Sequence, residues 1–294
     1  MTISVGCAQL GLDYGIANKT GILKLNDFKK ILKKLNKKKS LIDTAINYGN
    51  SEFLIGKSLN QVNKIEKYKI ITKLPNLRRI KSKNLEYEIS KLIQKSLKKM
   101  KLKNIYGVLI HDLEDLKSDN SEQIYKILIN LKNKGFIKKI GFSAYKIEDV
   151  KMAINKFQFD ILQFPFNIFD QRLRDKNLLK FLKKKKIKIH IRSIFLQGLL
   201  LMDKDEINKK FLKKIKIIDE WLKFLKKKKL SNLEACIIFI KNFDFYDHVI
   251  IGFDSYSHFK EVKKIYNKKN IIKINFDKFR NNSQLIYPQK WKLR

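Results

Sequence analysis

The pattern of hydrophobic and polar positions divides this chain of 294 residues into short apolar runs and longer amphipathic stretches. In residues 121–135, apolar side chains recur three, four and seven positions apart, the spacing of a helix face packed on a sheet. The same spacing predicts three more helices. They cover residues 25–38, 84–101 and 146–157.

The short apolar runs are typical of buried β-strands. They cover residues 3–8, 40–45, 69–74, 105–111, 138–143, 160–166, 187–193 and 248–253. Eight strands alternating with helices indicate either a doubly wound sheet or a (β/α)8 barrel. A doubly wound nucleotide-binding sheet carries GxGxxG after its first strand. Here that strand leads to GCAQLGLDYG, whose glycine spacing differs.

The number of strands therefore favours an α/β fold consisting of a single (β/α)8 TIM barrel. No linker or low-complexity tract divides the chain, so residues 1–294 are expected to form one domain. Residues 194–247 hold two helical stretches, and one of them is expected to be an extra helix before the last strand. A C-terminal tail follows that strand.

The composition adds a strongly basic charge, since 66 Lys and Arg against 28 Asp and Glu give +38. Basic charge raises the hypothesis of polyanion binding, because Lys and Arg contact phosphates. Only seven of the 66 basic residues are arginine, however, and the lysines are spread through nearly every segment. We interpret the charge as solvated helix faces and expect no specific nucleic-acid partner.

Cysteine and histidine usage limits other functions. Cys7 and Cys236 show no CxxC spacing, which fits a reducing compartment. The four histidines lack metal-ligand spacing, so no metal site is expected. No apolar stretch approaches the roughly 20 residues of a membrane helix, and the N-terminus lacks a signal-peptide pattern. A cytoplasmic protein without membrane contact is expected. GKS at 56–58 lacks the leading glycine of a phosphate-binding loop.

Polar residues end three successive expected strands. Asp43 ends the second strand and is followed by Tyr48, while Lys73 ends the third strand and His111 the fourth. In a (β/α)8 barrel these strand ends meet at one mouth, where the active site lies. Each residue alone is weak evidence, since an aspartate can cap a helix and a single histidine is often structural.

Together the four residues form a proton-donating set. A free phenol has a pKa of about 10 and gives up its proton too reluctantly for acid catalysis at neutral pH. An adjacent ammonium stabilises the phenolate, and Lys73 would supply it. Asp43 would keep Lys73 charged and in place, and His111 would donate a hydrogen bond to the substrate oxygen. The hypothesis is carbonyl reduction, with a proton from Tyr48 and a hydride from a cofactor.

In order, spacing and strand position, this tetrad resembles that of the aldo-keto reductases, and the resemblance covers nearly the whole chain. It implies an NAD(P)H-dependent oxidoreductase that reduces a small-molecule aldehyde or ketone, with NADPH as the usual cofactor and NADH as the second option. The alternative is a cofactor-binding barrel that serves as a regulatory or scaffolding subunit without significant turnover. The intact tetrad disfavours that alternative. The oligomeric state stays open.

The resemblance also implies which residues hold the cofactor. GFS (141–143) and LQFPFN (162–167) are similar to the strands that hold the nicotinamide carboxamide. IRSIFLQGLL (191–200) is similar to the segment that stacks on nicotinamide and wraps the pyrophosphate, and IIGFDSYSHFKEV (250–262) resembles the adenosine-binding segment. The implied cofactor-binding residues are Ser143, Gln163, Arg192, Ser193, Phe195, Gln197, Gly198, Gly252, Ser255, His258 and Glu261.

The chain departs from the family pattern in that segment and elsewhere. Ala144 stands where an asparagine often follows the serine, and Arg192 stands where an aromatic residue is common, although a guanidinium also stacks on rings. His258 replaces a frequent arginine, and Val262 replaces a frequent asparagine. These changes weaken the expected 2′-phosphate site. They predict a modest preference for NADPH over NADH that grows as the pH falls through the titration of His258.

The sequence indicates the substrate less directly than it indicates the cofactor. The opening GCAQLGLDYGIAN and the closing YPQKW resemble a bacterial subgroup linked with surface-polysaccharide genes, which implies a sugar or sugar-nucleotide carbonyl as one candidate. In this fold specificity lies in the loops and the tail. Candidates there are Tyr14, Asn47, Phe195 and Trp291, while Phe164, Phe166 and Phe169 fit pocket lining and ordinary packing equally well.

Overall fold

The computed structural model describes residues 2–36, 39–61, 68–211, 215–268, 272–291 and 293. In this part of the chain, eight parallel strands close into a barrel in chain order, and β1 pairs with β8. The strands are β1 Thr2–Gly6, β2 Leu41–Asp43, β3 Lys69–Leu74, β4 Ile105–Ile110, β5 Ile137–Ser143, β6 Ile161–Pro165, β7 Lys188–Arg192 and β8 His248–Gly252. The expected (β/α)8 barrel is confirmed, and each apolar run overlaps one of these strands.

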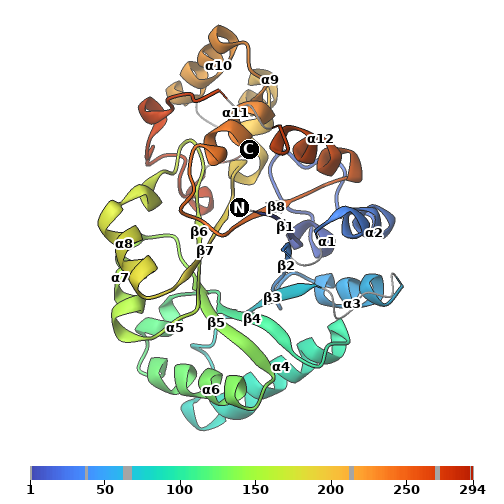
Figure 1. The fold of residues 1–294 in the computed structure, drawn as a ribbon, viewed down its shortest axis with the longest axis vertical. Helices are drawn as coiled ribbons and strands as arrows, with labels where there is room; N and C mark the ends of the chain where they lie inside the picture. The colour runs from blue at the N-terminus through green and yellow to red at the C-terminus, as the bar shows by residue number, and fades with distance from the viewer. Residues whose placement is uncertain are drawn as a thin grey trace.

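Helices surround the barrel (Figure 1). Those expected from the sequence are α2 Leu25–Lys34, α4 Leu85–Met100, α6 Ser121–Asn133 and α7 Ile147–Lys156. Residues 37 and 38, at the end of the first expected helix, lie outside the described residues. The remaining elements before β7 and after β8 are α1 Ala8–Gly11, α3 Ser51–Gln61, η2 Ser82–Asn84, α5 Glu114–Lys117, η3 Arg172–Arg174, α8 Lys176–Lys184, α12 Tyr256–Tyr266, η5 Asp277–Phe279 and η6 Pro288–Lys290.

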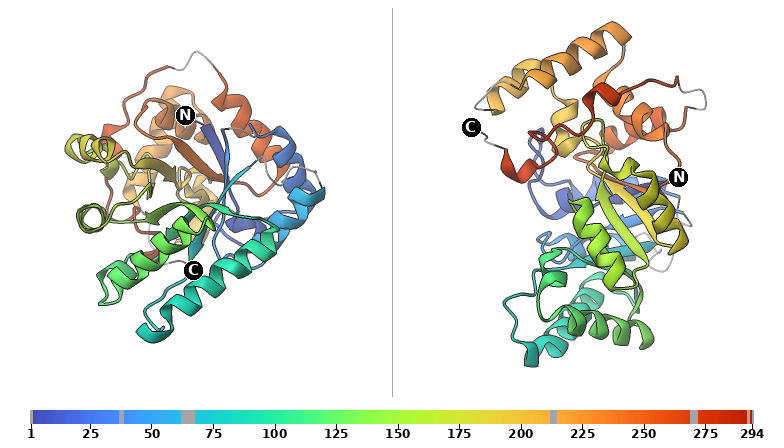
Figure 2. Two further views of the ribbon diagram at one scale, coloured as in Figure 1. Left: turned by 60° about the horizontal axis from the view of Figure 1, so that its bottom comes forward. Right: turned by 90° about the vertical axis from the view of Figure 1, so that its left-hand side faces the viewer.

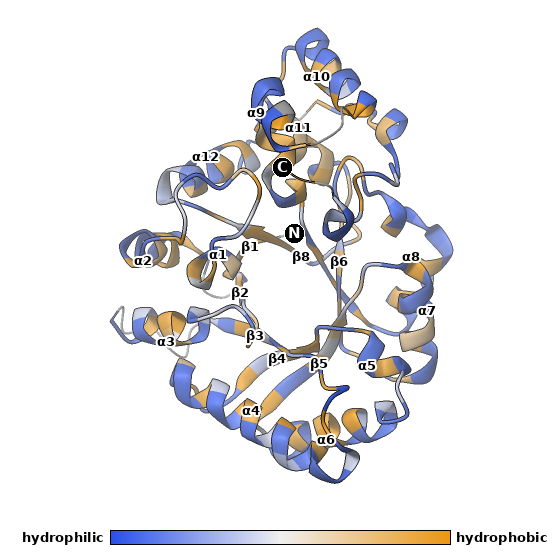
Figure 3. Ribbon diagram, turned by 180° about the vertical axis from the view of Figure 1, so that it is seen from behind, coloured by the Kyte–Doolittle hydropathy of each residue, from blue (hydrophilic) through white to orange (hydrophobic). Residues whose placement is uncertain are grey.

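Amphipathic patterning explains how these helices pack. The stripe in α6, which consists of Ile124, Ile127, Leu128 and Leu131, is buried against the barrel. Hydrophilic positions alternate with hydrophobic ones along the surrounding helices, while the strands are largely apolar (Figure 3). The basic charge is therefore carried mainly by solvated helix faces, as expected. Within the described residues, no helix is both long and apolar enough to span a membrane.

The connection between β7 and β8 holds more helices than the sequence suggested. Among the described residues it holds η4 Leu196–Leu201 and three α-helices, α9 Lys204–Lys210, α10 Lys216–Lys228 and α11 Asn232–Lys241, where two helical stretches were expected. These helices gather beyond one side of the barrel, at the top of Figure 1, and the C-terminal tail runs close to them (Figure 2). Trp221 of α10 contacts Phe279 of the tail, with ring centroids 5.4 Å apart.

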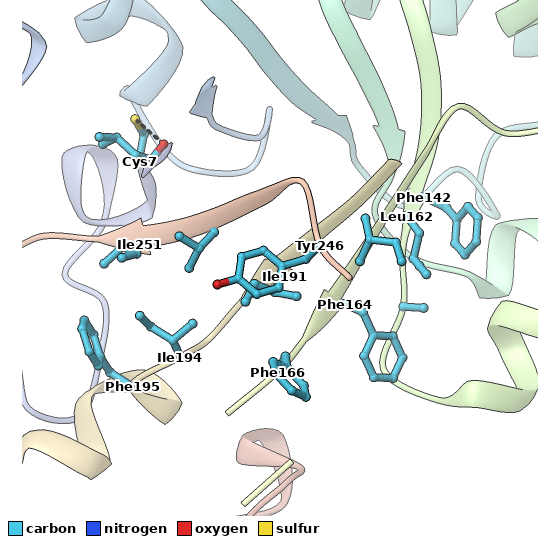
Figure 4. Close-up of a cluster of buried hydrophobic side chains, with 14 of the residues drawn as sticks. Cys7, Phe142, Leu162, Phe164, Phe166, Ile191, Ile194, Phe195, Tyr246 and Ile251 are labelled. Atoms are coloured by element: carbon cyan, nitrogen blue, oxygen red, sulfur yellow. Dashed lines mark hydrogen bonds between the residues drawn. The ribbon is translucent and has the colours of Figure 1, made fainter. Parts of the chain in front are cut away.

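The apolar core has an outer and an inner part. The outer part fills the space between strands and helices, and Figure 4 shows some of its members. The inner part lies inside the barrel and consists of Leu41, Ile71, Leu109, Ile161 and Ile250. Side chains two positions apart on a strand share a face. The residues two positions after these five therefore face the barrel interior above an apolar layer, and they are Asp43, Lys73, His111, Gln163 and Gly252.

The phenylalanines after β6 belong to the outer core. Phe164, Phe166 and Phe169 are fully buried, and Figure 4 shows the first two within the apolar cluster. Phe166 lies 5.0 Å from Phe239, ring centroid to ring centroid, and Phe169 contacts Trp221 at 6.2 Å. Ordinary packing is therefore their role, since none of the three borders the catalytic cavity described below.

A glycine allows α3 and α4 to approach closely. A Cβ atom built on Gly56 would lie 2.4 Å from the carbonyl oxygen of Lys99 and 2.8 Å from Cα of Met100. Backbone atoms cannot move aside cheaply, so only glycine fits at this position. The GKS tripeptide at 56–58 is thus part of a helix–helix contact.

Substituting Gly56 tests this contact. In an exposed helix interior, Gly→Ala stabilises by about 1 kcal/mol. We expect Gly56→Ala instead to lower the free energy of unfolding by roughly 1–3 kcal/mol, because the new methyl group overpacks the contact. Urea denaturation measures the change, with Lys57→Ala at the exposed neighbouring position as the control. A stabilised Gly56→Ala protein would contradict the close approach of α3 and α4.

Candidate functional site

A buried ion pair joins β2 and β3 at their C-terminal ends. Lys73 Nζ lies 2.6 Å from Asp43 Oδ2, and the two side chains are 1% and 5% exposed. Lys73 also donates to the carbonyl oxygen of Thr44 at 2.8 Å. Gln163 Nε2, from β6, donates to Asp43 Oδ1 at 2.7 Å. Both carboxylate oxygens are thus held, one from the neighbouring strand β3 and the other from β6 across the barrel.

The ion pair fixes the charge of Lys73. Burial by itself opposes a charged ammonium, but the adjacent Asp43 carboxylate outweighs burial, with a further contribution from Tyr48, and the pKa of Lys73 is raised. Lys73 is therefore protonated throughout the physiological range. A protonated ammonium inside the barrel is the electrostatic centre of the site.

Tyr48 stands beside that ammonium. Lys73 Nζ lies 5.1 Å from the centroid of the Tyr48 ring. The loop that carries Tyr48 turns back on itself, because Tyr48 N donates to Ala45 O at 3.0 Å and Ser51 N donates to Tyr48 O at 2.9 Å. Gly49 completes the turn with a φ of 51°, a conformation that favours glycine. The loop after β2 thereby holds the phenol at the mouth of the barrel.

His111 completes the set from the end of β4. Its ring lies edge-to-face with that of Tyr48, at a centroid separation of 6.0 Å and an interplanar angle of 80°. Burial, followed by the charges of Lys73 and Arg192, lowers the pKa of His111 to about 3. The imidazole is therefore neutral at pH 7 and can donate a hydrogen bond without adding charge. Among the described residues, no cluster of three His, Cys, Asp or Glu side chains could hold a metal ion.

The expected tetrad is brought together at one cavity. Asp43, Tyr48 and His111 border it, and Lys73 lies beneath them. The cavity is open to solvent on one side and continues past the ends of β7 and β8 to His258 of α12. One cavity therefore joins the four proposed catalytic residues to most of the residues expected to bind a cofactor.

The cavity end at Gln163, a proposed carboxamide ligand, fits a nicotinamide, whereas Ser143, the other proposed ligand, lies outside the described cavity wall. Ser143 of β5 pairs in register with Gln163 of β6. Gln163 Oε1 is buried and has no hydrogen-bond partner among the described residues. A buried acceptor without a donor is costly, and an amide N–H of a nicotinamide carboxamide would satisfy it. The residues present therefore fit that group.

The segment after β7 lies over the cavity. Ser193, Phe195, Gln197 and Gly198 border the cavity as expected. Gln197 O accepts a hydrogen bond from Ile16 N at 3.0 Å, which ties this segment to the loop after α1. Gly198 has a φ of 94°, and a Cβ there would lie 2.6 Å from Cβ of Ala17. Glycine is required at 198 for these two segments to meet.

The adenosine end is only partly as expected. Gly252 and His258 border the cavity. Ser255 caps α12 instead, where its Oγ accepts a hydrogen bond from His258 N at 3.2 Å. Glu261 is exposed on α12 and lies outside the cavity wall. Val262 is fully buried in the core.

The sequence reasoning missed several residues of the cavity wall, and Asp254 and Tyr145 are two of them. Asp254 follows β8, and its Oδ1 lies 3.2 Å from His258 Nδ1. Tyr145 follows β5, and the Arg192 guanidinium lies 4.3 Å from its ring centroid. Each stands two residues beyond the end of its strand. The rule that identified Asp43, polar residues at strand ends, would have identified both.

Of the four residues proposed to set substrate specificity, two border the cavity and two do not. Tyr14 and Phe195 border the cavity, whereas Asn47 and Trp291 lie outside its described wall. Trp291 packs on Phe211, with ring centroids 5.4 Å apart, and donates to Leu285 O at 3.3 Å. Trp291 therefore anchors the tail against the segment before α10.

Comparison with known proteins agrees with this geometry. The model of the aldo/keto reductase family matches residues 2–279. The solved holo form of the aldo-keto reductase AKR11C1 from Bacillus halodurans is similar, with a TM-score of 0.70 and 18% identity, over 92% of this chain and 88% of that chain. The glycerol dehydrogenase AKR11B4 from Gluconobacter oxydans gives a TM-score of 0.68 and 20% identity, over 91% and 87% of the two chains. At these identities the two structures share the fold. No curated protein matches the chain significantly.

The depressed pKa of His111 gives a testable pH dependence. An unfolded histidine binds a proton near pH 6.5, whereas folded His111 does so only near pH 3. Between these values the unfolded state binds more protons, so stability falls as the pH drops below about 6.5. From pH 7.5 to pH 5, we expect the wild type to lose up to about 2 kcal/mol more unfolding free energy than His111→Gln. Urea denaturation at both pH values measures this, and equal losses would show that His111 titrates normally.

Proposed function

Because the chain belongs to the aldo/keto reductase family, whose members carry out NAD(P)H-dependent carbonyl reduction, we propose that it reduces an aldehyde or ketone with Tyr48 as the proton donor. The observation that carries the proposal is the buried Lys73 ammonium, paired with Asp43 at 2.6 Å and 5.1 Å from the centroid of the Tyr48 ring. A regulatory or scaffolding barrel has no use for this pair. Burying two charges costs desolvation free energy that well-packed apolar residues would not, so a purely structural barrel gains little from the pair.

Each catalytic residue has one task in this mechanism. A bound reduced nicotinamide supplies the hydride that the carbonyl carbon receives. Tyr48 gives its proton to the carbonyl oxygen as that oxygen takes up the electron pair of the broken π bond. Lys73 stabilises the resulting phenolate until it regains a proton from solvent. Neutral His111 donates a hydrogen bond to the same oxygen.

The orientation of the cofactor rests on the strand ends. Gln163 would hold the carboxamide through its free acceptor Oε1, and Ser143, which pairs with it in register and lies outside the described cavity wall, would be the second ligand. Gln163 also bonds Asp43 through its other amide atom, at 2.7 Å. The residue that would position the nicotinamide is thereby coupled to the ion pair that serves Tyr48. Hydride delivery and proton delivery are set by one connected group of side chains.

A sugar or sugar-nucleotide carbonyl is our candidate substrate. Tyr14 and Tyr145 border the cavity and are each 40% exposed, so their ring faces are available beside the catalytic residues. Aromatic rings with one apolar face and one polar edge suit ligands that carry both kinds of surface, as sugar rings do. This supports the candidate without distinguishing one sugar from another.

The preference between NADPH and NADH is proposed to depend on Asp254 and His258. Hydrogen bonding from His258, despite partial burial, lowers the pKa of Asp254, which therefore stays ionised at neutral pH. A carboxylate beside His258 opposes a 2′-phosphate there, and an imidazole replaces the permanent cation that many family members have. NADPH is the expected cofactor, but with a small advantage over NADH.

Removing the phenolic oxygen tests the catalytic assignment. Tyr48→Phe deletes the proton donor and little volume. We expect the rate of reduction of a reactive probe such as 4-nitrobenzaldehyde to fall roughly 10²–10⁴-fold, with the dissociation constant for NADPH nearly unchanged. Tyr87→Phe, at an exposed position on α4, is the matched control. A near wild-type rate in Tyr48→Phe would exclude Tyr48 as the donor.

Neutralising Asp254 tests the cofactor assignment. Asp254→Asn keeps the side-chain shape and removes the charge. We expect NADPH to bind roughly tenfold more tightly and NADH to change little, because only NADPH carries the 2′-phosphate. Fluorescence titration with each cofactor gives the two dissociation constants. Asp244→Asn removes the same charge at an exposed site ahead of β8, at the far end of that strand. Equal shifts for both cofactors would place the 2′-phosphate elsewhere.

A further inference from the structure

Arg192 is a charged residue of the cavity that lacks a charged partner. It is the last residue of β7, and within the described part of the chain no carboxylate lies within salt-bridge distance of it. Its guanidinium donates to the Oγ atoms of Ser193 at 3.2 Å and Ser143 at 3.3 Å, and to Ala144 O at 3.3 Å. These acceptors are neutral, so the positive charge is left uncompensated.

The other charges at this end of the cavity do not offset it. Lys73 and Asp43 form a pair that is neutral as a whole. His111 is uncharged at pH 7, because burial, Lys73 and Arg192 keep its pKa near 3. Asp254, the further acid of the cavity wall, is hydrogen-bonded with His258. The catalytic end therefore carries about one net positive charge, located on Arg192.

The orientation of the guanidinium leaves a flat surface for a ligand. One of its faces is covered by the Tyr145 ring, at 4.3 Å from the ring centroid. Two of its nitrogens are engaged at the edge by Ser143, Ala144 and Ser193. Arg192 borders the cavity, so a ligand in the cavity can contact the part of the guanidinium that Tyr145 does not cover. Guanidinium faces stack on planar rings, and Tyr145 supports this one from behind.

The neighbouring residues indicate which ring would occupy that face. Ser143, which accepts the hydrogen bond from Arg192, is also a proposed carboxamide ligand, and it pairs in register with Gln163. A nicotinamide held by these two side chains lies next to the guanidinium. In its reduced form this ring is neutral and rich in electrons, whereas in its oxidised form it is a cation. A fixed cation attracts the first through its π face and repels the second.

We propose that Arg192, supported by Tyr145, makes this site bind the reduced nicotinamide cofactor more tightly than the oxidised one. The inference rests on the proposed function, since it requires that a nicotinamide binds here. A neutral aromatic residue at the position of Arg192 would not distinguish the reduced from the oxidised nicotinamide by its charge. After each turnover the oxidised cofactor is the weaker ligand, which favours its exchange for the reduced form.

The test compares dissociation constants of reduced and oxidised cofactor without any carbonyl substrate. Isothermal titration calorimetry at pH 7.5 gives Kd for NADPH and NADP⁺, and separately for NADH and NAD⁺. Within each pair the phosphates and sugars are identical, so the ratio of oxidised to reduced Kd reports the ring charge. We expect a ratio of at least tenfold in the wild type. By linkage, tenfold corresponds to a rise of about 30 mV in the potential of the bound two-electron couple.

Three variants separate charge from shape. Arg192→Gln removes the charge and should lower the ratio about tenfold, whereas Arg192→Lys keeps the charge and should retain most of it. Arg192→Tyr offers a neutral ring and should bind both redox forms with a ratio near that of Arg192→Gln. Tyr145→Leu should lower the ratio partially, because the guanidinium loses its support while the charge remains. Circular dichroism spectra confirm that each variant is folded.

The outcomes distinguish this inference from the proposed function. A wild-type ratio near one, or an equal ratio in wild type and Arg192→Gln, overturns the inference while leaving carbonyl reduction intact. Equal weakening of both redox forms in Arg192→Gln shows that Arg192 contacts phosphate, and it also overturns the inference. Failure of the wild type to bind any of the four cofactors overturns the proposed function itself, and the inference falls with it.

Discussion

A lysine ammonium inside a barrel is stable only beside a carboxylate, and the remainder of the site is arranged around this requirement. Asp43 supplies the carboxylate from β2, and Gln163 reaches the second carboxylate oxygen from β6 on the other side of the barrel. Closure of the sheet brings these strands together. Removal of Asp43 would leave an unpaired buried charge, a loss of about 3–5 kcal/mol. The pair thus links the stability of the barrel mouth to the chemistry at Tyr48.

The cavity has two ends of different charge. At the catalytic end, the Lys73–Asp43 pair is neutral and His111 is uncharged, so the Arg192 guanidinium dominates. At the other end, the Asp254 carboxylate lies against His258. A cofactor that spans both ends would meet a positive charge near its ring and a negative charge near its ribose. Discrimination between reduced and oxidised cofactor would therefore depend on Arg192. Discrimination between NADPH and NADH would depend on Asp254 and His258.

The parts of this account that could be predicted from sequence are those with local signals. Each strand falls on a short run rich in apolar residues, and Asp43, Lys73 and His111 stand at strand ends, so pattern and fold together located them. The packing of Phe166 depended on Phe239, which is more than seventy positions away along the chain, and no local pattern could distinguish core from pocket there. The contact of Tyr145 with Arg192 likewise joins the ends of β5 and β7. Glu261 stays a prediction, and its exposure on α12 follows from the helix phase, which the strand-end rule does not address.

The central claim is that Lys73 acts through Tyr48, and a double-mutant cycle tests it most directly. Single-turnover reduction of 4-nitrobenzaldehyde would be measured for wild type, Tyr48→Phe, Lys73→Met and the variant with both changes. If Lys73 serves only to assist proton donation by Tyr48, adding Lys73→Met to Tyr48→Phe costs little further rate, and the double variant is about as slow as Tyr48→Phe. Losses that multiply, so that the double variant is slower than Tyr48→Phe by the full factor of Lys73→Met, would show that the two residues act independently and would contradict the account.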